Sequence, residues 1–198
     1  MKENGEWLNS LALEKQVSAG DIPKIELYID QVIELFEEIF ADAKRNSEEK
    51  ILTKTMINNY AKGKLFYPIQ NKKYSRNHIM LISLIYQMKS VLSISDVKKV
   101  LDGVNEKAMQ HEWDLESFYA SFLELQQSNV EIFKGIFHKQ SEEAERQAEG
   151  LEDADELKEV LLIASLVHTS NLYRRAAEKW SMNWRSGGKA NDKSADRR

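Results

Sequence analysis

Apolar residues recur at the helical period along most of the chain, and short polar stretches divide them into segments. The clearest segments fall within residues 25–40, 79–88, 115–148 and 157–184. An apolar stripe at this period is typical of a helix that buries one face. The chain has only two prolines and eight glycines to interrupt its helices. The pattern therefore predicts an all-α fold with, at most, one small β-wing.

The first strong helix signal lies near the N-terminus. Asp21 can cap free N–H groups, and Pro23 suits a first helical turn because proline lacks the donor that this turn leaves unused. The apolar stripe that follows predicts a core helix running to about Ala43. A polar loop is expected at residues 44–50.

A short helix is predicted at Thr53–Lys62, with Thr53 as its N-cap and Gly63 as a left-handed C-cap. The side expected to face inward carries Met56, Ile57, Tyr60 and Ala61. The side expected to face outward carries Lys54, Thr55, Asn58, Asn59 and Lys62. Adjacent asparagines give so short a helix little intrinsic stability, and recognition by its exposed face is one reason for it to exist. The alternative is a connecting turn of helix within a larger bundle.

A β-wing is predicted at residues 65–74. Pro68 forbids a helix there, and the polar residues 70–73 suit an exposed turn between two short strands. Tyr74 closes the wing. The wing tip carries Lys72 and Lys73, which can reach backbone phosphates or the minor groove.

Two helices are expected after the wing. Ser75 caps the first, which carries a strongly apolar core side. The second is expected at Asp96–Leu101, capped by Ser93 or Ser95 and ended by Gly103. Together with the preceding elements they complete a winged helix-turn-helix domain.

This DNA-binding domain is predicted to span residues 21–104, and residues 105–185 differ in character. Two long amphipathic helices are expected there, at Asp114–Ala148 and at about Leu157–Trp184. A short acidic turn joins them, and Gly150 interrupts the helical pattern within it. Such a pair predicts an antiparallel helical hairpin. The hairpin could cover the first domain, pair with a second subunit or enclose a ligand.

Both ends of the chain lack a clear core pattern. Residues 1–20 are weakly patterned, and we expect a flexible N-terminal segment there, with a short docked helix as the alternative. Residues 186–198 are polar and contain no aromatic residue, so a disordered tail is predicted.

The charge is distributed unevenly. Between Thr53 and Lys99 there are nine lysine or arginine residues and one acid, Asp96, so this segment carries a formal +8 in a chain whose total is −4. Neutralisation of phosphates supplies most non-specific DNA affinity, and the charge of the contacting face matters more than the total. A solvated basic surface without a partner fits the same composition. The order of elements, a short helix followed by a wing, favours nucleic acid.

No enzyme chemistry is evident. The chain has no cysteine, which excludes disulfides and thiolate ligands. His78, His111, His138 and His168 lack metal-ligand spacing, although His138 and His168 could meet across the hairpin. No glycine-rich phosphate loop, serine elbow or HExxH motif occurs, and the longest apolar run, Ile79–Tyr86, is too short to span a membrane. We expect a cytoplasmic protein that is not an enzyme and has no cofactor, metal or membrane contact.

The stretch LTKTMINNYAKGKLFYP, the later KKYSRNHIMLISLIYQMKSVLSISDVKKVL and the upstream LYIDQV carry a resemblance. Over residues 22–103 they resemble domain-of-unknown-function family 1836, which is found in low-GC Gram-positive bacteria. That family is uncharacterised and is regarded as related to the MerR type of winged-helix regulator. The resemblance implies DNA binding through the short helix and the wing.

The broader MerR likeness rests on the placing of Tyr60, Gly63–Leu65, Pro68, Tyr74–Ser75 and the Leu-Ser-Ile-Ser-Asp-Val run at 92–97. It implies that Tyr60 and Tyr74 contact phosphate or anchor the wing. Two departures are visible. Asparagine stands where the superfamily's recognition helix usually has arginine, and a polar insertion separates the first two helices. MerR-type proteins usually dimerise through a C-terminal coiled coil, so the likeness implies that the hairpin is the dimer element.

Taken together, these patterns predict a homodimeric transcriptional regulator that binds double-stranded DNA sequence-specifically, with an effector that the pattern does not specify. The alternative is a protein-interaction adaptor that uses the C-terminal hairpin and binds no DNA. The side chains expected to contact DNA are Thr53, Lys54, Thr55, Asn58, Asn59, Tyr60, Lys62, Lys64, Lys72, Lys73, Tyr74 and Arg76.

Overall fold

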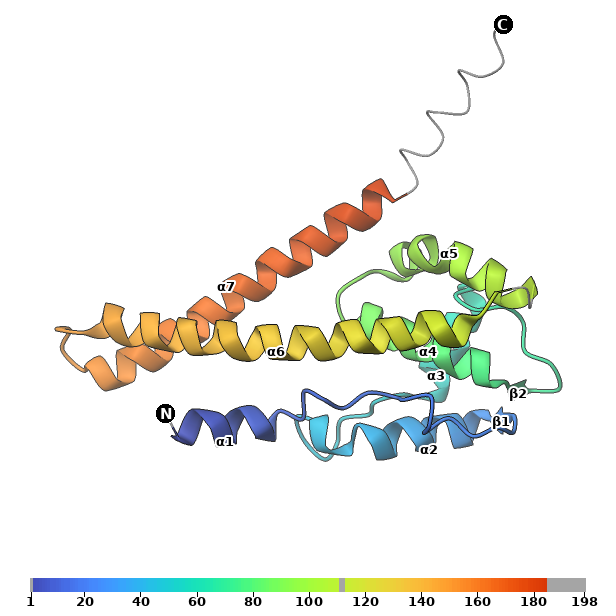
Figure 1. The fold of residues 1–198 in the computed structure, drawn as a ribbon, viewed down its shortest axis with the longest axis horizontal. Helices are drawn as coiled ribbons and strands as arrows, with labels where there is room; N and C mark the ends of the chain where they lie inside the picture. Colours follow the sequence, from blue (N-terminus) through green and yellow to red (C-terminus); the bar gives the residue numbers. More distant parts are fainter. Residues whose placement is uncertain (1, 111–112, 185–198) are drawn as a thin grey trace, which may run out of the picture.

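The computed structural model describes residues 2–110 and 113–184. In chain order these residues form α1 (Lys2–Ser10), β1 (Leu27–Tyr28), α2 (Ile29–Ile39), the short 3-10 helix η1 (Ala41–Ala43), α3 (Lys54–Lys62), β2 (Lys73–Tyr74), α4 (Arg76–Lys89), α5 (Ile94–Gln110), α6 (Leu115–Ala148) and α7 (Ala154–Asn183). The predicted all-α class with a small β element is confirmed. Figure 1 shows a globular part at one end and the two longest helices extending from it.

The core is built around α4. Ser75 is its N-cap, as predicted, and every residue from His78 to Ile85 is buried. A helix that is buried on all sides needs neighbours all around it. α5, α6 and β2 contact α4 directly, and α2 contributes Phe36, whose ring centroid lies 6.1 Å from that of Tyr86.

α2 begins later than the sequence predicts. Asp21 and Pro23 do not start the helix, which begins at Ile29. Asp21 instead closes a turn, because the backbone N–H of Ser18 donates to its carboxylate at 2.8 Å. Leu27 and Tyr28, just before α2, are extended because β1 pairs with β2, so a tertiary pairing overrides the local capping signal.

α5 is longer than predicted. Ser93 caps it, since its Oγ accepts from the backbone N–H of Asp96 at 3.1 Å. The helix does not end at Leu101 and continues through Gly103 to Gln110. Continuation buries Ala108 in the core, which offsets the weak helix propensity of glycine.

One hydrophobic core joins residues from Val17 to Tyr119. The predicted domain boundary after residue 104 therefore falls inside α5, and the start of α6 belongs to the same packed unit. The Tyr119 hydroxyl donates to the carbonyl oxygen of Val17 at 2.6 Å, and a second hydrogen bond joins it to Ser83 Oγ at 2.9 Å.

The N-terminal segment is anchored on α6, contrary to the expectation of a flexible segment. Leu8 is buried, and the Trp7 ring stacks on Phe137 with centroids 4.9 Å apart. The Lys134 ammonium adds an ion pair with Glu14 at 2.6 Å. The docked helix, which the sequence offered as the alternative, is the arrangement found. The tail predicted at 186–198 lies outside the described residues.

α6 and α7 form the predicted hairpin. Residues 149–153 join them, and the break falls at Gly150, whose φ of 82° is in the left-handed region. Figure 1 shows α7 crossing α6 near this turn and then diverging from it, and α7 also contacts α5. Among the residues that the structure describes, no helix has both the length and the hydrophobicity needed to cross a membrane.

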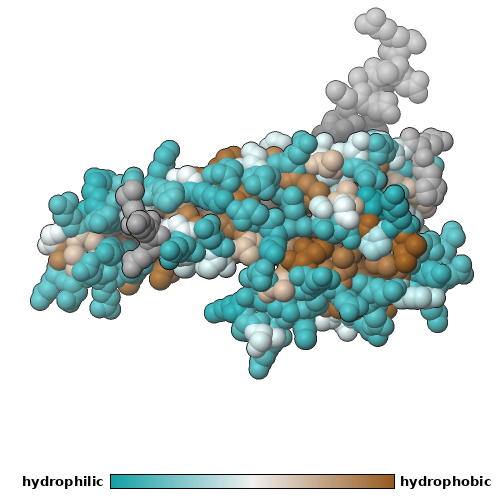
Figure 2. Space-filling view, turned by 60° about the horizontal axis from the view of Figure 1, so that its bottom comes forward, coloured by the Kyte–Doolittle hydropathy of each residue, from teal (hydrophilic) through white to brown (hydrophobic). Residues whose placement is uncertain are grey.

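Exposed apolar side chains are numerous on the hairpin. On α7 they include Val160, Ile163, Val167, Leu172, Tyr173 and Trp180. Figure 2 shows a mostly hydrophilic surface, with the largest group of hydrophobic atoms near the middle of its right half.

Candidate nucleic-acid interface

α3 presents a polar face to solvent. Thr53 caps it as predicted, because its Oγ1 accepts from the backbone N–H of Met56 at 3.1 Å. Ile57 and Tyr60 are buried and fix the orientation of the helix. The exposed side chains are Lys54, Thr55, Asn58, Asn59, Ala61 and Lys62. The predicted outward set is therefore exposed, and Ala61, which was expected to face inward, lies beside it.

α3 ends differently from the prediction. Gly63 has a φ of −71° and is right-handed, whereas Lys64 takes the left-handed conformation with a φ of 55°. Gly63 is needed for space, because a Cβ there would lie 2.6 Å from Leu65 Cδ1 and 3.0 Å from Ile94 Cγ2. Lys64, the second residue after α3, is exposed to solvent.

The wing is smaller than predicted. Asn71 and Lys72 both have positive φ, 49° and 59°, and the Lys73 N–H donates to the Gln70 carbonyl oxygen at 2.8 Å. Two successive residues with positive φ are typical of a type I′ turn. Gln70 and Lys73 form only a single bridge, so residues 65–69 are not a strand. β2 pairs instead with β1, which immediately precedes α2 in the sequence.

The two wing lysines differ in environment. Lys72 is exposed at the turn. The Lys73 ammonium lies 5.5 Å from the ring centroid of Tyr28 on the paired strand, a cation–π contact. Tyr28 is 53 % exposed and was not among the predicted site residues. No local signal could have found it, because only the β1–β2 pairing brings it beside the wing.

Tyr60 and Tyr74 are packed inside the fold. Each is 3 % exposed, and burial raises the pKa of both hydroxyl groups. The Tyr74 ring meets those of Phe66 and His78 edge-on, with each pair of centroids 6.2 Å apart. The expected phosphate contact of these tyrosines is therefore corrected, because their rings support α3 and the wing from within. For Tyr74, the anchoring role that the resemblance offered matches this packing.

His78 holds the wing segment against α4. Its Nδ1 lies 2.7 Å from Ser75 Oγ, and its Nε2 lies 3.1 Å from the carbonyl oxygen of Tyr67. Burial lowers the pKa of His78, and the hydrogen bond to the Tyr67 carbonyl opposes this shift. A neutral imidazole that donates from Nε2 satisfies both neighbours.

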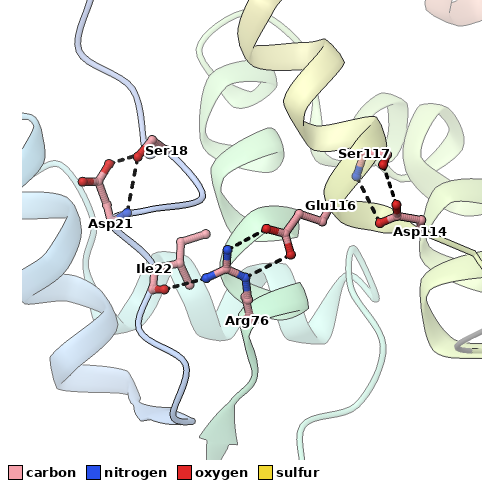
Figure 3. A network of polar contacts seen from close by, with 7 residues as sticks. All are labelled: Ser18, Asp21, Ile22, Arg76, Asp114, Glu116 and Ser117. Carbon is pink, nitrogen blue, oxygen red and sulfur yellow. Dashed lines mark hydrogen bonds and ion pairs between the residues drawn. The ribbon is translucent and has the colours of Figure 1, made fainter.

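Arg76 is occupied within the protein. Its guanidinium donates to the Ile22 carbonyl oxygen at 2.7 Å and forms a two-point contact with Glu116, with nitrogen–oxygen distances of 2.8 and 3.3 Å. Figure 3 shows it between the N-terminal residues and the first turn of α6, close to the Asp114 cap and the Ser18–Asp21 turn. The expected phosphate contact of Arg76 is corrected, because two-point pairing with a carboxylate fixes its geometry.

The remaining basic side chains differ in their partners. Lys54 forms an ion pair with Asp30 at 2.8 Å. Within the described part of the chain, Lys62, Lys64 and Lys72 form no ion pair. The acidic turn between α6 and α7 lies at the opposite end of the molecule from α3 and β2 (Figure 1) and leaves this basic surface uncovered.

No group of histidine and acidic residues that could hold a metal ion occurs among the described residues. His111 lies outside them. Neither the curated proteins nor the solved structures contain a match to the chain. The model of one protein family, described as "Domain of unknown function (DUF1836)", matches residues 17–122. These limits coincide with the packed core, which starts at Val17 and has Phe122 against its far side, and the chain belongs to this family.

Proposed function

We propose that the chain is a DNA-binding transcriptional regulator of MerR-like type. The exposed polar face of α3 enters the major groove, and the turn at Asn71–Lys72 contacts the backbone beside it. The observation that carries the proposal is the exposure of Asn58 and Asn59, together with basic and hydroxyl side chains, on a helix without a single acid. Asparagine can form paired hydrogen bonds with adenine, and lysine neutralises phosphate.

The revised contact set is smaller than the one the sequence predicts. It keeps Lys54, Thr55, Asn58, Asn59, Lys62, Lys64, Lys72 and Lys73, and adds Tyr28. It excludes Tyr60 and Tyr74, which are buried, and Arg76, which is paired with Glu116. Thr53 serves as the helix cap.

The test uses the full chain and duplexes that it selects from a random library. Fluorescence anisotropy at several salt concentrations gives the affinity and its salt slope. Asn58→Ala is expected to weaken the selected duplex by about 1–3 kcal/mol and to relax the preferred sequence. Lys72→Ala is expected to weaken all duplexes alike and to reduce the salt slope by about one.

The matched control is Lys139→Ala, which removes an exposed lysine from α6, away from the proposed interface. It should leave the affinity for the selected duplex within error. Equal losses from Lys139→Ala and Lys72→Ala would show that only total charge matters. Unchanged binding by the variants at Lys54, Asn58, Asn59 and Lys72 would refute the interface.

We further propose that the regulator is a homodimer that pairs through α7 and acts in the cytoplasm. Val160, Ile163 and Val167 are each more than half exposed on one stripe of α7, and such a stripe needs a partner. The ends of α7 differ in charge, because residues 155–159 hold three acids and one lysine and residues 174–179 hold three bases and one glutamate, a net −2 against +2. An antiparallel pair brings these unlike ends together.

Sedimentation equilibrium tests the dimer. Val167→Asp is expected to shift the chain to monomer, because it places like charges on the stripe near the middle of α7, while Lys139→Asp should not. A chain that is monomeric at all concentrations, binds no DNA and retains a protein partner in high salt would instead favour the adaptor function. The same apolar stripe supports that alternative, with the helix of another protein as the occupant.

A further inference from the structure

A cavity of about 580 Å³ lies between the segment that follows α3 and the outer face of α5. Phe66–Ile69 line one side, and residues from Lys98 to Met109 line the other. Its volume falls within the range of about 300–1,000 Å³ that is usual for small-molecule sites. The cavity borders the exposed face of α3, because Ala61 and Lys64 both line it.

The apolar part of the cavity is largely preformed. Phe66 is buried, and the Tyr67 ring is held against His78 with centroids 4.0 Å apart. The Tyr67 hydroxyl also lies 3.3 Å from Ser75 Oγ, so its orientation is fixed at both ends. Met109 on the opposite side is 51 % exposed, and a flexible thioether adapts to the shape of a ligand. These side chains form a slot that suits an aromatic or branched apolar group.

Asn105 supplies a polar group that the fold does not use. Its Oδ1 is buried and has no hydrogen-bond partner within the described part of the chain. Buried acceptors are nearly always paired, and an unpaired one is costly. Because this oxygen accepts no hydrogen bond in the protein, the Asn105 side chain can turn toward the cavity without losing one. It can then accept a hydrogen bond from an N–H group of the ligand.

Some of the charged side chains around the cavity form ion pairs and others do not. Lys98 and Asp102 neutralise each other at 3.1 Å. Glu106 on α5 and Lys64 after α3 form no ion pair with any described residue. The cavity therefore offers one unpaired carboxylate and one unpaired ammonium on different elements.

We propose that this cavity binds a free amino acid with an aromatic or branched apolar side chain. The α-ammonium of the ligand pairs with Glu106 and donates to Asn105, and its carboxylate pairs with Lys64. Its side chain enters the slot between Phe66, Tyr67 and Met109. A zwitterion with an apolar body matches the two unpaired charges and the apolar slot together, whereas a simple amine or acid matches only one charge.

Binding at this site also regulates DNA binding, a step that rests on the proposed function. Lys64 belongs to the proposed DNA-contacting set, and a carboxylate bound to it competes with phosphate. The amino acid is therefore expected to lower DNA affinity, and DNA must lower affinity for the amino acid by the same factor. The segment 66–69 leads directly into the turn at Asn71–Lys72, so occupancy also acts on the wing.

Isothermal titration calorimetry on the full chain without DNA tests the site. The probes are L-phenylalanine, phenethylamine, which lacks the carboxylate, and hydrocinnamate, which lacks the ammonium. L-phenylalanine is expected to bind most tightly. Glu106→Gln should weaken the binding of L-phenylalanine and phenethylamine by about tenfold and leave that of hydrocinnamate unchanged. Lys64→Met should weaken the binding of L-phenylalanine and hydrocinnamate by a similar factor and leave that of phenethylamine unchanged.

Failure to bind L-phenylalanine, or equal binding of all three probes, would overturn the amino-acid site. Circular dichroism of each variant confirms that it is folded, and Lys139→Ala, on α6 outside the cavity, serves as the control that should leave L-phenylalanine binding unchanged. In the second arm, DNA affinity is measured with and without L-phenylalanine. A chain that binds L-phenylalanine but no DNA would refute the proposed function alone, and one that binds both independently would refute the regulation alone.

Discussion

The Lys54 ammonium lies 2.8 Å from the carboxylate of Asp30, so the first turns of α2 and α3 are joined by an ion pair. Both side chains are well exposed, at 59 % and 70 %. Exposed pairs of this kind contribute little to stability. The pair nonetheless places a negative charge beside a lysine of the proposed DNA interface.

Removal of this carboxylate is expected to strengthen DNA binding. In Asp30→Asn, Lys54 is free to pair with phosphate and one source of repulsion is lost, so affinity should rise severalfold at low salt and the salt slope should steepen. Anisotropy titrations of a selected duplex measure this. The control is Asp42→Asn, which frees Lys15 from a similar exposed pair at 2.9 Å outside the interface. Equal gains from both variants would argue against a specific role of Asp30.

Gly63→Ala is expected to destabilise the protein by about 1–3 kcal/mol, because the added Cβ would press on the buried Leu65 and on Ile94. Gly135→Ala is the matched control. It lies within α6 with nothing within 4 Å of its Cβ position, so it should stabilise by about 0.5–1 kcal/mol. Urea unfolding of both variants gives the two changes, and a neutral Gly63→Ala would mean that Leu65 and the start of α5 shift to make room for the methyl group.

Tyr119→Phe is expected to cost about 1–3 kcal/mol near neutral pH, because it leaves the buried Val17 carbonyl without its donor. Burial raises the pKa of Tyr119 to about 12, with the Ser83 hydrogen bond opposing the shift. The unfolded chain loses this proton near pH 10, so the stability of the native protein should fall as pH rises from about 10 to 12. The difference from Tyr119→Phe should shrink over the same window, and a constant difference would contradict the raised pKa.

His78 predicts a second pH dependence, on the acidic side. Burial lowers the pKa of His78 below the usual value of about 6.5. Below that pH the unfolded chain therefore binds a proton at His78 more readily than the folded chain does. Stability should therefore fall as pH drops below about 6.5. His78→Asn, which is expected to be less stable at pH 7 because it loses ring packing, should show a shallower fall. Denaturant midpoints across this range compare the two slopes, and parallel curves would exclude His78 as the cause.

The features that the sequence predicted correctly depend on residues that are close together in the sequence. Thr53 and Ser75 act as caps because a hydroxyl three residues before a backbone N–H is a local arrangement. The break at Gly150 and the exposure of Asn58 also followed from spacing alone. These features need no knowledge of the rest of the chain.

The errors share a different cause. Asp21 failed as a helix start because Leu27 and Tyr28, further along the chain, pair with β2. Gly103 failed as a stop because Ala108 has a place in the core. Arg76 was assigned to DNA, although Glu116 and Ile22 occupy it. β2 is distant in sequence from Asp21, Glu116 and Ile22 are distant from Arg76, and the core that receives Ala108 is built from the whole domain. No local pattern reports where such a partner will be.

The two-residue sheet limits how far the Lys72 turn can move relative to α3. β1 runs into α2 without a break, and Ser75 alone separates β2 from α4. The short ladder thus ties the Lys72 turn rigidly to the scaffold that carries α3. A duplex held by both would have a fixed distance between its two points of contact. Because phosphates recur at every base pair, an insertion between the two points of contact should cost no more than Lys72→Ala.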